Sequence, residues 1–224
     1  MLTDIVKGYF YRKFKTSFAK SGEDIQIAHL LNNVQRGFYV DVGAHHPISG
    51  SNTYFFYLRG WSGICIEPNP EMEKLHRRYR SKDIFLNFGV AEAAGTMTYY
   101  RFNHSNLNTF SEDIINTSGI KHDVIGKTEV SMRSLAELLG KYCESQRSID
   151  FMSIDVEGFE LSVIRSNDWS LYRPKYVMME THKSLKEDMS SNLVMLMEAN
   201  NYTFCGKTIL RDAVGTLLFQ DNQL

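Results

Sequence analysis

The sequence lacks the features that would place a protein in a specialised class. Its formal net charge is −1 at pH 7 with a pI near 6.7, and so even a charge balance argues against binding to nucleic acid. No stretch approaches the roughly 18 apolar residues of a membrane span, and the N-terminus shows no signal-peptide pattern. We therefore expect a soluble, cytoplasmic protein.

Cysteine is also scarce. The 3 cysteines are widely separated, which favours reduced thiols over a disulfide or a metal site. Cys65 and Cys205 fall within apolar runs typical of strands, so we expect both thiols to be buried.

The chain divides into a short N-terminal segment and one larger domain. At 224 residues, with 43% apolar and 23% charged residues, it can form one sizeable core. Residues 1–20 combine a basic excess with apolar side chains near helical spacing. They predict a basic amphipathic helix that covers a sheet edge, with contact to a membrane surface or a partner protein as the alternative. Residues 21–224 form the domain, with residues 96–132 as an inserted hairpin or edge strands.

Short apolar runs alternate with amphipathic stretches through the domain, which predicts a doubly wound α/β fold. The central runs are almost wholly apolar, as expected for parallel strands buried on both faces. The last two runs follow each other without a helix and must pair antiparallel. The expected strands span residues 37–43, 63–68, 84–91, 149–156, 175–180, 202–207 and 213–219. The expected helices span residues 52–59, 70–80, 134–143, 159–166 and 186–200.

The ends of the first two strands predict a nucleoside site. In such a sheet, ligands bind outside the carboxyl ends of the strands, where the strand order reverses. The first strand ends at Asp41 and Gly43, and a glycine there lets the backbone turn sharply and approach a ligand. Glu67, followed by Pro68, ends the second strand. Its carboxylate is placed to accept both hydroxyls of a ribose, at about 1.5–3 kcal/mol for each charge-assisted bond.

The missing glycines indicate which nucleoside ligand binds. A dinucleotide site needs the pattern G-x-G-x-x-G, whose amides hold a pyrophosphate. Here Gly43 is followed by Ala44, and His45 occupies the position of the second glycine. S-adenosylmethionine carries no phosphate, and its cationic end suits an acid such as Asp41. Asn87, in the third strand, passes near the expected position of the adenine. The predicted cofactor-binding residues are Asp41, Gly43, His45, Glu67, Pro68, Asn87 and Asp155.

Polar residues after the fourth and fifth strands predict the reacting end of the site. Asp155 and Glu157 follow the fourth strand, and Glu180 and His182 close the fifth. A histidine can serve as general base near neutral pH, and oxygen ligands with one imidazole also suit Mg²⁺ or Mn²⁺. The predicted catalytic residues are Asp155, Glu180 and His182, and the alternative bases are His45 and His46.

These segments, taken together, resemble the FkbM family of methyltransferases. The resemblance extends from residue 21 to residue 204, and the order of the segments is more specific than any one of them. The segments that carry it are residues 21–24, 41–47, 51–53, 59–70 and 154–160.

The resemblance implies a Rossmann-like class I fold, with a seven-stranded, mostly parallel sheet that ends in an antiparallel hairpin. It also implies S-adenosylmethionine-dependent O-methylation of a sugar, a sugar nucleotide or a secondary metabolite. By similarity, Asp41 and Gly43 line the methionine end, Glu67 holds the ribose, and Asp155 faces donor and acceptor. Where the wider class has a second glycine, this chain has His45. An NAD-dependent sugar oxidoreductase or epimerase, and a noncatalytic module that docks a partner, are the alternative functions.

Overall fold

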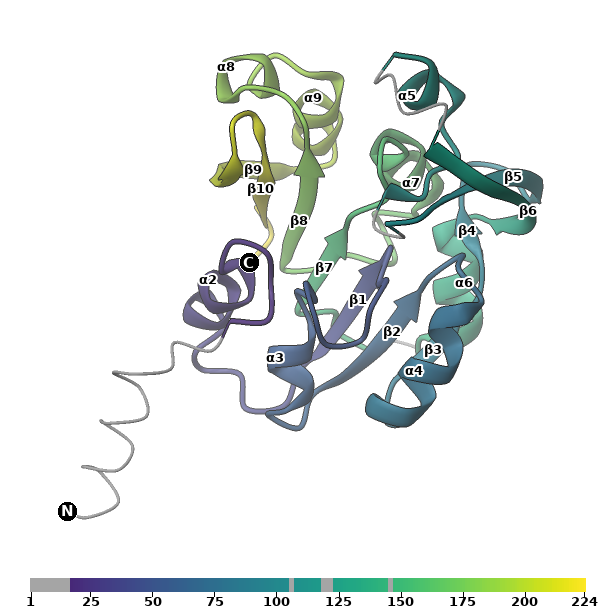
Figure 1. The fold of residues 1–224 in the computed structure, drawn as a ribbon. Coiled ribbons are helices and arrows are strands. Elements are labelled where there is room, and N and C mark those ends of the chain that lie inside the picture. Colours follow the sequence, from purple (N-terminus) through teal and green to yellow (C-terminus); the bar gives the residue numbers. More distant parts are fainter. Residues whose placement is uncertain (1–16, 105–106, 118–122, 145–146) are drawn as a thin grey trace.

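A computed structural model describes residues 17–104, 107–117, 123–144 and 147–224. Its central element is a seven-stranded sheet in the order β3-β2-β1-β7-β8-β10-β9 (Figure 1). Strands β3, β2, β1, β7 and β8 are parallel, and β10 is antiparallel to both β8 and β9. This order confirms the predicted Rossmann-like class I fold with its antiparallel edge. The strands of this sheet are β1 (Phe38–Val42), β2 (Ser62–Ile66), β3 (Ile84–Leu86), β7 (Phe151–Ile154), β8 (Tyr176–Thr181), β9 (Tyr202–Arg211) and β10 (Val214–Asp221). The helices are α2 (Glu23–Leu30), α3 (Tyr54–Tyr57), α4 (Glu71–Tyr79), α5 (Glu112–Thr117), α6 (Leu135–Tyr142), α7 (Glu160–Ser166), α8 (Leu185–Asp188) and α9 (Asn192–Ala199).

The central strands are buried on both faces, which explains their nearly unbroken apolar sequence. Every residue of β1 is buried. Val40 and Val42 belong to a core cluster that includes apolar side chains of α6, α7 and α9, whereas Tyr39 packs in a second cluster with α2 and α3. With helices on both faces, the site is confined to the strand ends. In the part of the chain that the structure describes, no helix is long and apolar enough to cross a bilayer.

Residues 84–91, predicted as one strand, form two. The first half is β3, whereas β4 (Gly89–Val90) pairs with β6 (Val124–Arg133) in a separate sheet of order β4-β6-β5. The chain turns at Asn87, whose side-chain amide donates to the carbonyl oxygens of Glu67 (2.8 Å) and Pro68 (2.9 Å). The single-strand prediction is wrong because these bonds tie the turn to the end of β2. Strand β5 (Gly95–Phe102) pairs antiparallel with β6, as a hairpin requires.

Two predicted helices are shorter in the structure. The helix expected over residues 52–59 is reduced to α3, in the middle of that range. The helix expected over residues 186–200 is divided into α8 and α9, because Ser184 and Ser191 each accept a hydrogen bond from a backbone N–H and start a new helix. The other three predicted helices correspond to α4, α6 and α7.

The described part of the N-terminal segment is a bend. Residues 17–20 form no helix, and the remainder of the helix predicted over residues 1–20 lies outside the described residues. The buried carboxylate of Asp24 organises the bend by accepting hydrogen bonds from the Ser17 hydroxyl (2.6 Å) and the Phe18 backbone N–H (2.7 Å). The chain therefore reaches α2 through a fixed loop.

The cysteines differ in their exposure. All 3 thiols are free, and Cys65 is buried in β2 as predicted. Cys205 is exposed, so the prediction of a buried thiol is wrong there. It lies in the edge strand β9, most of whose residues are exposed or half-buried, whereas the central strand β1 is buried throughout.

Candidate functional site

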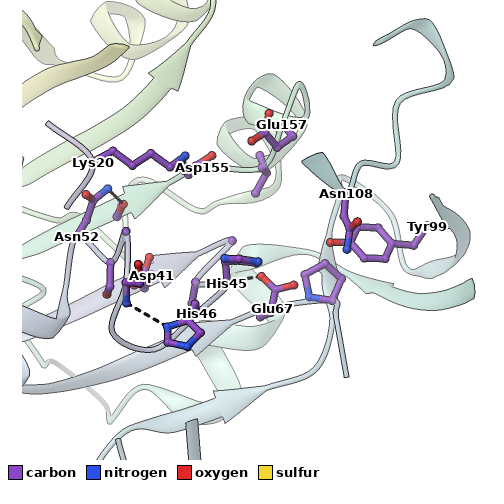
Figure 2. Close-up of a pocket in the computed structure, with 18 of the residues that line it drawn as sticks. Lys20, Asp41, His45, His46, Asn52, Glu67, Tyr99, Asn108, Asp155 and Glu157 are labelled. Carbon is purple, nitrogen blue, oxygen red and sulfur yellow. Dashed lines mark hydrogen bonds and ion pairs between the residues drawn. The ribbon is translucent and has the colours of Figure 1, made fainter. Parts of the chain in front are cut away.

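A cavity of about 420 Å³ lies at the carboxyl ends of β1, β2 and β7 (Figure 2). The loop after β1, the ends of β2 and β7, and the segment around β5 line it, and Lys20 reaches it from the bend before α2. The predicted residues found in its lining are Asp41, Gly43, His45, Glu67, Pro68 and Asp155. Asn87, Glu180 and His182 lie outside this lining but contact residues that belong to it, namely Glu67, Lys20 and Glu157 respectively.

Gly43 allows two loops of the site to meet. Its φ is +82°, a conformation that side chains disfavour, and a Cβ atom there would lie 1.8 Å from the carbonyl oxygen of Asp155. Its backbone N–H donates to the carbonyl oxygen of Ile66 (2.9 Å), which ties the turn to β2. The backbone of the turn after β1 therefore packs directly against the backbone of the loop after β7, and no side chain fits between them.

The buried carboxylate of Asp41 is held by a hydroxyl group and lies near a guanidinium group. The Thr53 hydroxyl donates to it at 2.5 Å, and Arg80 Nη1 lies 3.9 Å away. Burial raises the pKa of Asp41, and Arg80 and Thr53 act in the opposite direction. Arg80 is itself fully buried and pairs with Asp83 at 2.7 Å. Sequence reasoning missed Arg80, because a basic residue at the end of an amphipathic helix is usually exposed.

Glu67 is buried at the end of β2 and is held by two backbone groups. Its Oε2 accepts from the N–H of His45 (2.9 Å), and its Oε1 accepts from the N–H of Asn69 (2.8 Å). Burial raises the pKa of Glu67 to about 7, although these N–H groups lower it. Because each carboxylate oxygen has further lone pairs, Glu67 can accept ligand hydroxyls while held in place.

His45 and His46 shape the turn after β1. The backbone of His45 has a left-handed φ of +39°, and its carbonyl oxygen accepts from His76 Nε2 at 2.9 Å. Burial lowers the pKa of His45, which favours its neutral form. His46 Nδ1 accepts from the backbone N–H groups of Ile48 (3.2 Å) and Ser49 (3.0 Å). This bonding makes His46 part of the turn and weighs against it as the alternative base.

Lys20 joins two of the predicted catalytic carboxylates. Its Nζ lies 3.0 Å from Asp155 Oδ2 and 3.1 Å from Glu180 Oε1, and Figure 2 shows its side chain directed at Asp155. Burial and the Glu180 carboxylate raise the pKa of Asp155, whereas Lys20 lowers it. Sequence reasoning placed Lys20 among the basic residues of an N-terminal helix, since no local pattern connects it with a residue 135 positions away.

The groups that could hold a metal differ from those expected. His182 Nε2 lies 3.4 Å from Glu180 Oε2 and 3.6 Å from Glu157 Oε2, and one ligand atom from each residue lies within 4.8 Å of the others. Among the described residues, Glu157 thus replaces Asp155 in this group. The chain leaves β7 after Ile154, and the φ of +48° at Glu157 redirects its side chain.

Charge in this group is unevenly distributed. Burial would raise the pKa of Glu180, but hydrogen bonds with His182 and Asp155 and the charge of Lys20 lower it to about 2. Burial and the Glu180 carboxylate raise the pKa of Glu157 to about 7. The hydrogen bond to Glu180 raises the pKa of His182. The group thus places an ionised acid beside an imidazole of raised basicity.

The segment around β5 closes the other end of the cavity. Tyr99, Asn108 and Phe110 line it there, and Figure 2 shows Tyr99 and Asn108 on the side away from Lys20. The Thr109 hydroxyl donates to the backbone carbonyl oxygen of Glu157 at 2.9 Å, and this bond attaches the segment to the loop after β7. Sequence reasoning singled out none of these residues individually, and an aromatic side chain such as Tyr99 in a half-buried strand is typical of a core.

Comparison with known proteins identifies the family. Residues 41–204 match the methyltransferase FkbM domain. No curated protein matches the sequence. Among solved structures, the chain is similar to 1,6-didemethyltoxoflavin-N1-methyltransferase of Burkholderia thailandensis, with 14% identity, a TM-score of 0.47 and coverage of 98% of this chain and 86% of that one. It is also similar to fibrillarin of Aeropyrum pernix, with 10% identity, a TM-score of 0.47 and coverage of 89% and 76%. Because the domain match spans most of the sequence, the chain belongs to the FkbM family of methyltransferases.

Proposed function

We propose that this methyltransferase transfers the methyl group of S-adenosylmethionine to a hydroxyl oxygen of a sugar, a sugar nucleotide or a secondary metabolite. The observation that carries the proposal is one cavity with two chemically different ends. Figure 2 shows Glu67, a buried acceptor of hydroxyl hydrogens, on the Tyr99 side of Asp155. Asp155 lies toward the other end, where Lys20 joins it to Glu180, which contacts His182 beside the cavity. The first end suits a nucleoside and the second suits a reacting hydroxyl.

The turn after β1 fits a cofactor without phosphate. The backbone N–H groups of Gly43 and Ala44 both donate to the carbonyl oxygen of Ile66, and that of His45 donates to Glu67. All three amides are therefore used within the protein, whereas a dinucleotide site needs such amides for a pyrophosphate. This arrangement favours S-adenosylmethionine over NAD, the cofactor of the alternative oxidoreductase or epimerase.

The protein has to position the acceptor and remove its proton. S-adenosylmethionine, when bound, supplies an electrophilic methyl group and becomes S-adenosylhomocysteine as the C–S bond breaks. His182 Nε2 donates to Glu180, so the Nδ1 atom can accept the hydroxyl proton as the acceptor oxygen forms its bond to carbon. Glu180 orients the ring and stabilises the imidazolium. Asp155, held by Lys20, aligns the acceptor, and alignment can supply about 7–11 kcal/mol.

A divalent cation is a second way to remove the proton. Glu157, Glu180 and His182 offer two oxygens and one nitrogen within 4.8 Å of one another. These donors fit Mg²⁺ or Mn²⁺, which would lower the pKa of an acceptor hydroxyl. In this variant of the proposal His182 is a ligand instead of the base, so the two variants predict different responses to a chelator.

Replacing His182 with glutamine is expected to lower kcat by about 10²- to 10⁴-fold, because glutamine can neither take up a proton nor carry charge. The dissociation constant for S-adenosylmethionine should change less than about threefold, since His182 lies beside the cavity lining. The assay supplies S-adenosylmethionine with an isotopically labelled methyl group to sugars, sugar nucleotides and cell-extract metabolites. Mass spectrometry then detects the gain of one methyl group.

His29→Gln is the matched control, because His29 is exposed on α2, and it should retain full activity. Loss of activity in chelator and recovery with Mg²⁺ would favour the metal variant, whereas indifference to chelator would favour His182 as base. Tighter binding of NAD than of S-adenosylmethionine in calorimetry would contradict the proposed function. Binding without methylation of any acceptor would favour the noncatalytic module.

The affinity for S-adenosylmethionine should fall as the pH is lowered from 7.5 to 5.5. Glu67 has a pKa of about 7 and accepts ribose hydroxyls best when ionised, so its contribution is present above that pH and is lost below it. At pH 6 about one carboxylate in ten is ionised, which corresponds to roughly tenfold weaker binding. Calorimetry across this range, below the titration of an α-amino group near pH 8, measures the effect.

Glu67→Gln should bind S-adenosylmethionine more weakly than the unmodified protein at pH 7.5. Its affinity should not change between pH 7.5 and 5.5. Glu157 has a similar pKa of about 7, so Glu157→Gln serves as the control and should keep the pH dependence of the unmodified protein. If the affinity still depends on pH in Glu67→Gln but no longer does so in Glu157→Gln, Glu157 is the titrating group.

A further inference from the structure

We propose that Lys20, assisted by Asn52, receives the carboxylate at the methionine end of the methyl donor. This inference rests on the proposed function and adds an anion-binding subsite to a site otherwise rich in acids. It gives a binding role to a residue outside the stretch that matches the family domain, which begins at residue 41.

The acidic lining of the cavity favours such a subsite. Asp41, Glu67, Asp155 and Glu157 all line the cavity, and among the described lining residues Lys20 is the one lysine or arginine. The sulfonium and ammonium groups of S-adenosylmethionine suit acidic surroundings, whereas its carboxylate would be repelled by them. A carboxylate brought into this cavity is therefore most favourable next to Lys20.

The cation is held where the methionine end is expected. Lys20 Nζ contacts Asp155 Oδ2, and the carbonyl oxygen of Asp155 lies next to Gly43. Figure 2 shows Lys20 and Asn52 on the side of the cavity away from Tyr99. Nucleoside and amino-acid ends of one ligand would thus reach opposite ends of the cavity.

Asn52 adds a neutral donor on the same side. Its Nδ2 donates to Ser153 Oγ at 3.0 Å, which leaves the second N–H of the amide to bind a ligand oxygen. An ammonium and an amide N–H together match the two oxygens of a carboxylate.

The lysine is charged and its backbone is fixed. Burial lowers the pKa of Lys20, but Asp155 and Glu180 outweigh it and raise that pKa above its usual value. The preceding bend is closed on the buried carboxylate of Asp24, and the Phe18 ring packs edge-on against Tyr54 at 4.9 Å between centroids. The ammonium is therefore presented to the site from an anchored segment.

The test compares ligands that differ only in the carboxylate. Calorimetry measures the binding of S-adenosylmethionine and its decarboxylated analogue, which keeps the sulfonium and the amine. We expect the unmodified protein to prefer S-adenosylmethionine by at least about tenfold, as one charge-assisted hydrogen bond would give. In Lys20→Met the preference should fall below about threefold, because S-adenosylmethionine loses its partner while the dicationic analogue binds equally well or more tightly.

Three controls distinguish this role from others. Binding of 5′-methylthioadenosine, which lacks the amino-acid end, should be unchanged in Lys20→Met and shows that the nucleoside end is intact. Lys20→Arg keeps the charge and should keep most of the preference, and Lys82→Met, at an exposed position, should behave as the unmodified protein. Equal weakening of both ligands in Lys20→Met would overturn the inference and leave Lys20 as a partner of Asp155 and Glu180. Failure of the unmodified protein to bind S-adenosylmethionine would instead overturn the proposed function.

Discussion

Replacing Arg80 with methionine should lower the free energy of unfolding by about 3–5 kcal/mol, the range expected when one partner of a buried ion pair is removed. The guanidinium is fully buried, with Nε 2.7 Å from Asp83 and Nη1 3.9 Å from Asp41. It also donates to the hydroxyls of Thr53 (2.8 Å) and Ser51 (3.2 Å). Methionine has a similar length but no donor, so two buried carboxylates and three hydroxyls, with that of Tyr39 (3.0 Å) as the third, would lose their shared partner.

The loss should extend from stability to the site. Asp41, Ser51 and Gly43 line the same cavity, so movement of the uncompensated Asp41 would disturb the turn and weaken cofactor binding. Arg80 lowers the pKa of Asp41, so without it Asp41 takes up a proton more readily in the folded state and its folded pKa rises. The destabilisation should therefore diminish as the pH is lowered from 7 to 5.

Arg77→Met is the matched control for this variant. Arg77 lies on the same helix, but its side chain is 76% exposed and its partner Glu73 is a surface residue four positions away. Such pairs contribute about 0.3–0.5 kcal/mol. Urea unfolding of both variants gives the comparison, and equal destabilisation by the two substitutions would mean that Arg80 does not compensate the buried acids.

The positions of the strands could be predicted from sequence, and so could much of the candidate site. Parallel strands buried on both faces leave apolar runs, and the carboxyl ends of such strands share one edge of the sheet. Residues directly after those runs, such as Asp41, Glu67 and Asp155, are therefore brought together by topology alone. The prediction needed no knowledge of any side-chain contact.

The remaining features depend on contacts between distant parts of the chain. Lys20 contacts Asp155, which is 135 positions away in the sequence. Arg80 is buried because strand β1, the loop at residues 51–53 and the turn at Asp83 all contact its side chain. Past the end of a strand, side chains no longer alternate between faces, so the orientation of Glu157 could not be predicted from spacing. The turn at Asn87 likewise depends on carbonyl groups at the end of a neighbouring strand.

The second large effect is expected for Gly43→Ala, which should weaken binding of S-adenosylmethionine by at least about 100-fold, or about 2.7 kcal/mol. The new methyl group would lie 1.8 Å from the carbonyl oxygen of Asp155, a distance at which one of the two loops must move. Movement would separate the ends of β1 and β7, where the donor and acceptor are expected to meet. Calorimetry measures the affinity, and urea unfolding measures the accompanying loss of stability.

Gly60→Ala separates the collision from the backbone strain. Gly60 has nearly the same φ, +86° against +82°, yet nothing lies within 4 Å of the position of its Cβ atom. Its substitution should cost only the left-handed conformation, about 1–2 kcal/mol, and should leave cofactor affinity unchanged. Gly43→Ala should exceed that cost in stability by at least about 2 kcal/mol, as severe overpacking does. If both variants lose the same stability and both retain cofactor affinity, close approach of the two loops is not what the site requires of Gly43, and the backbone conformation alone accounts for the glycine.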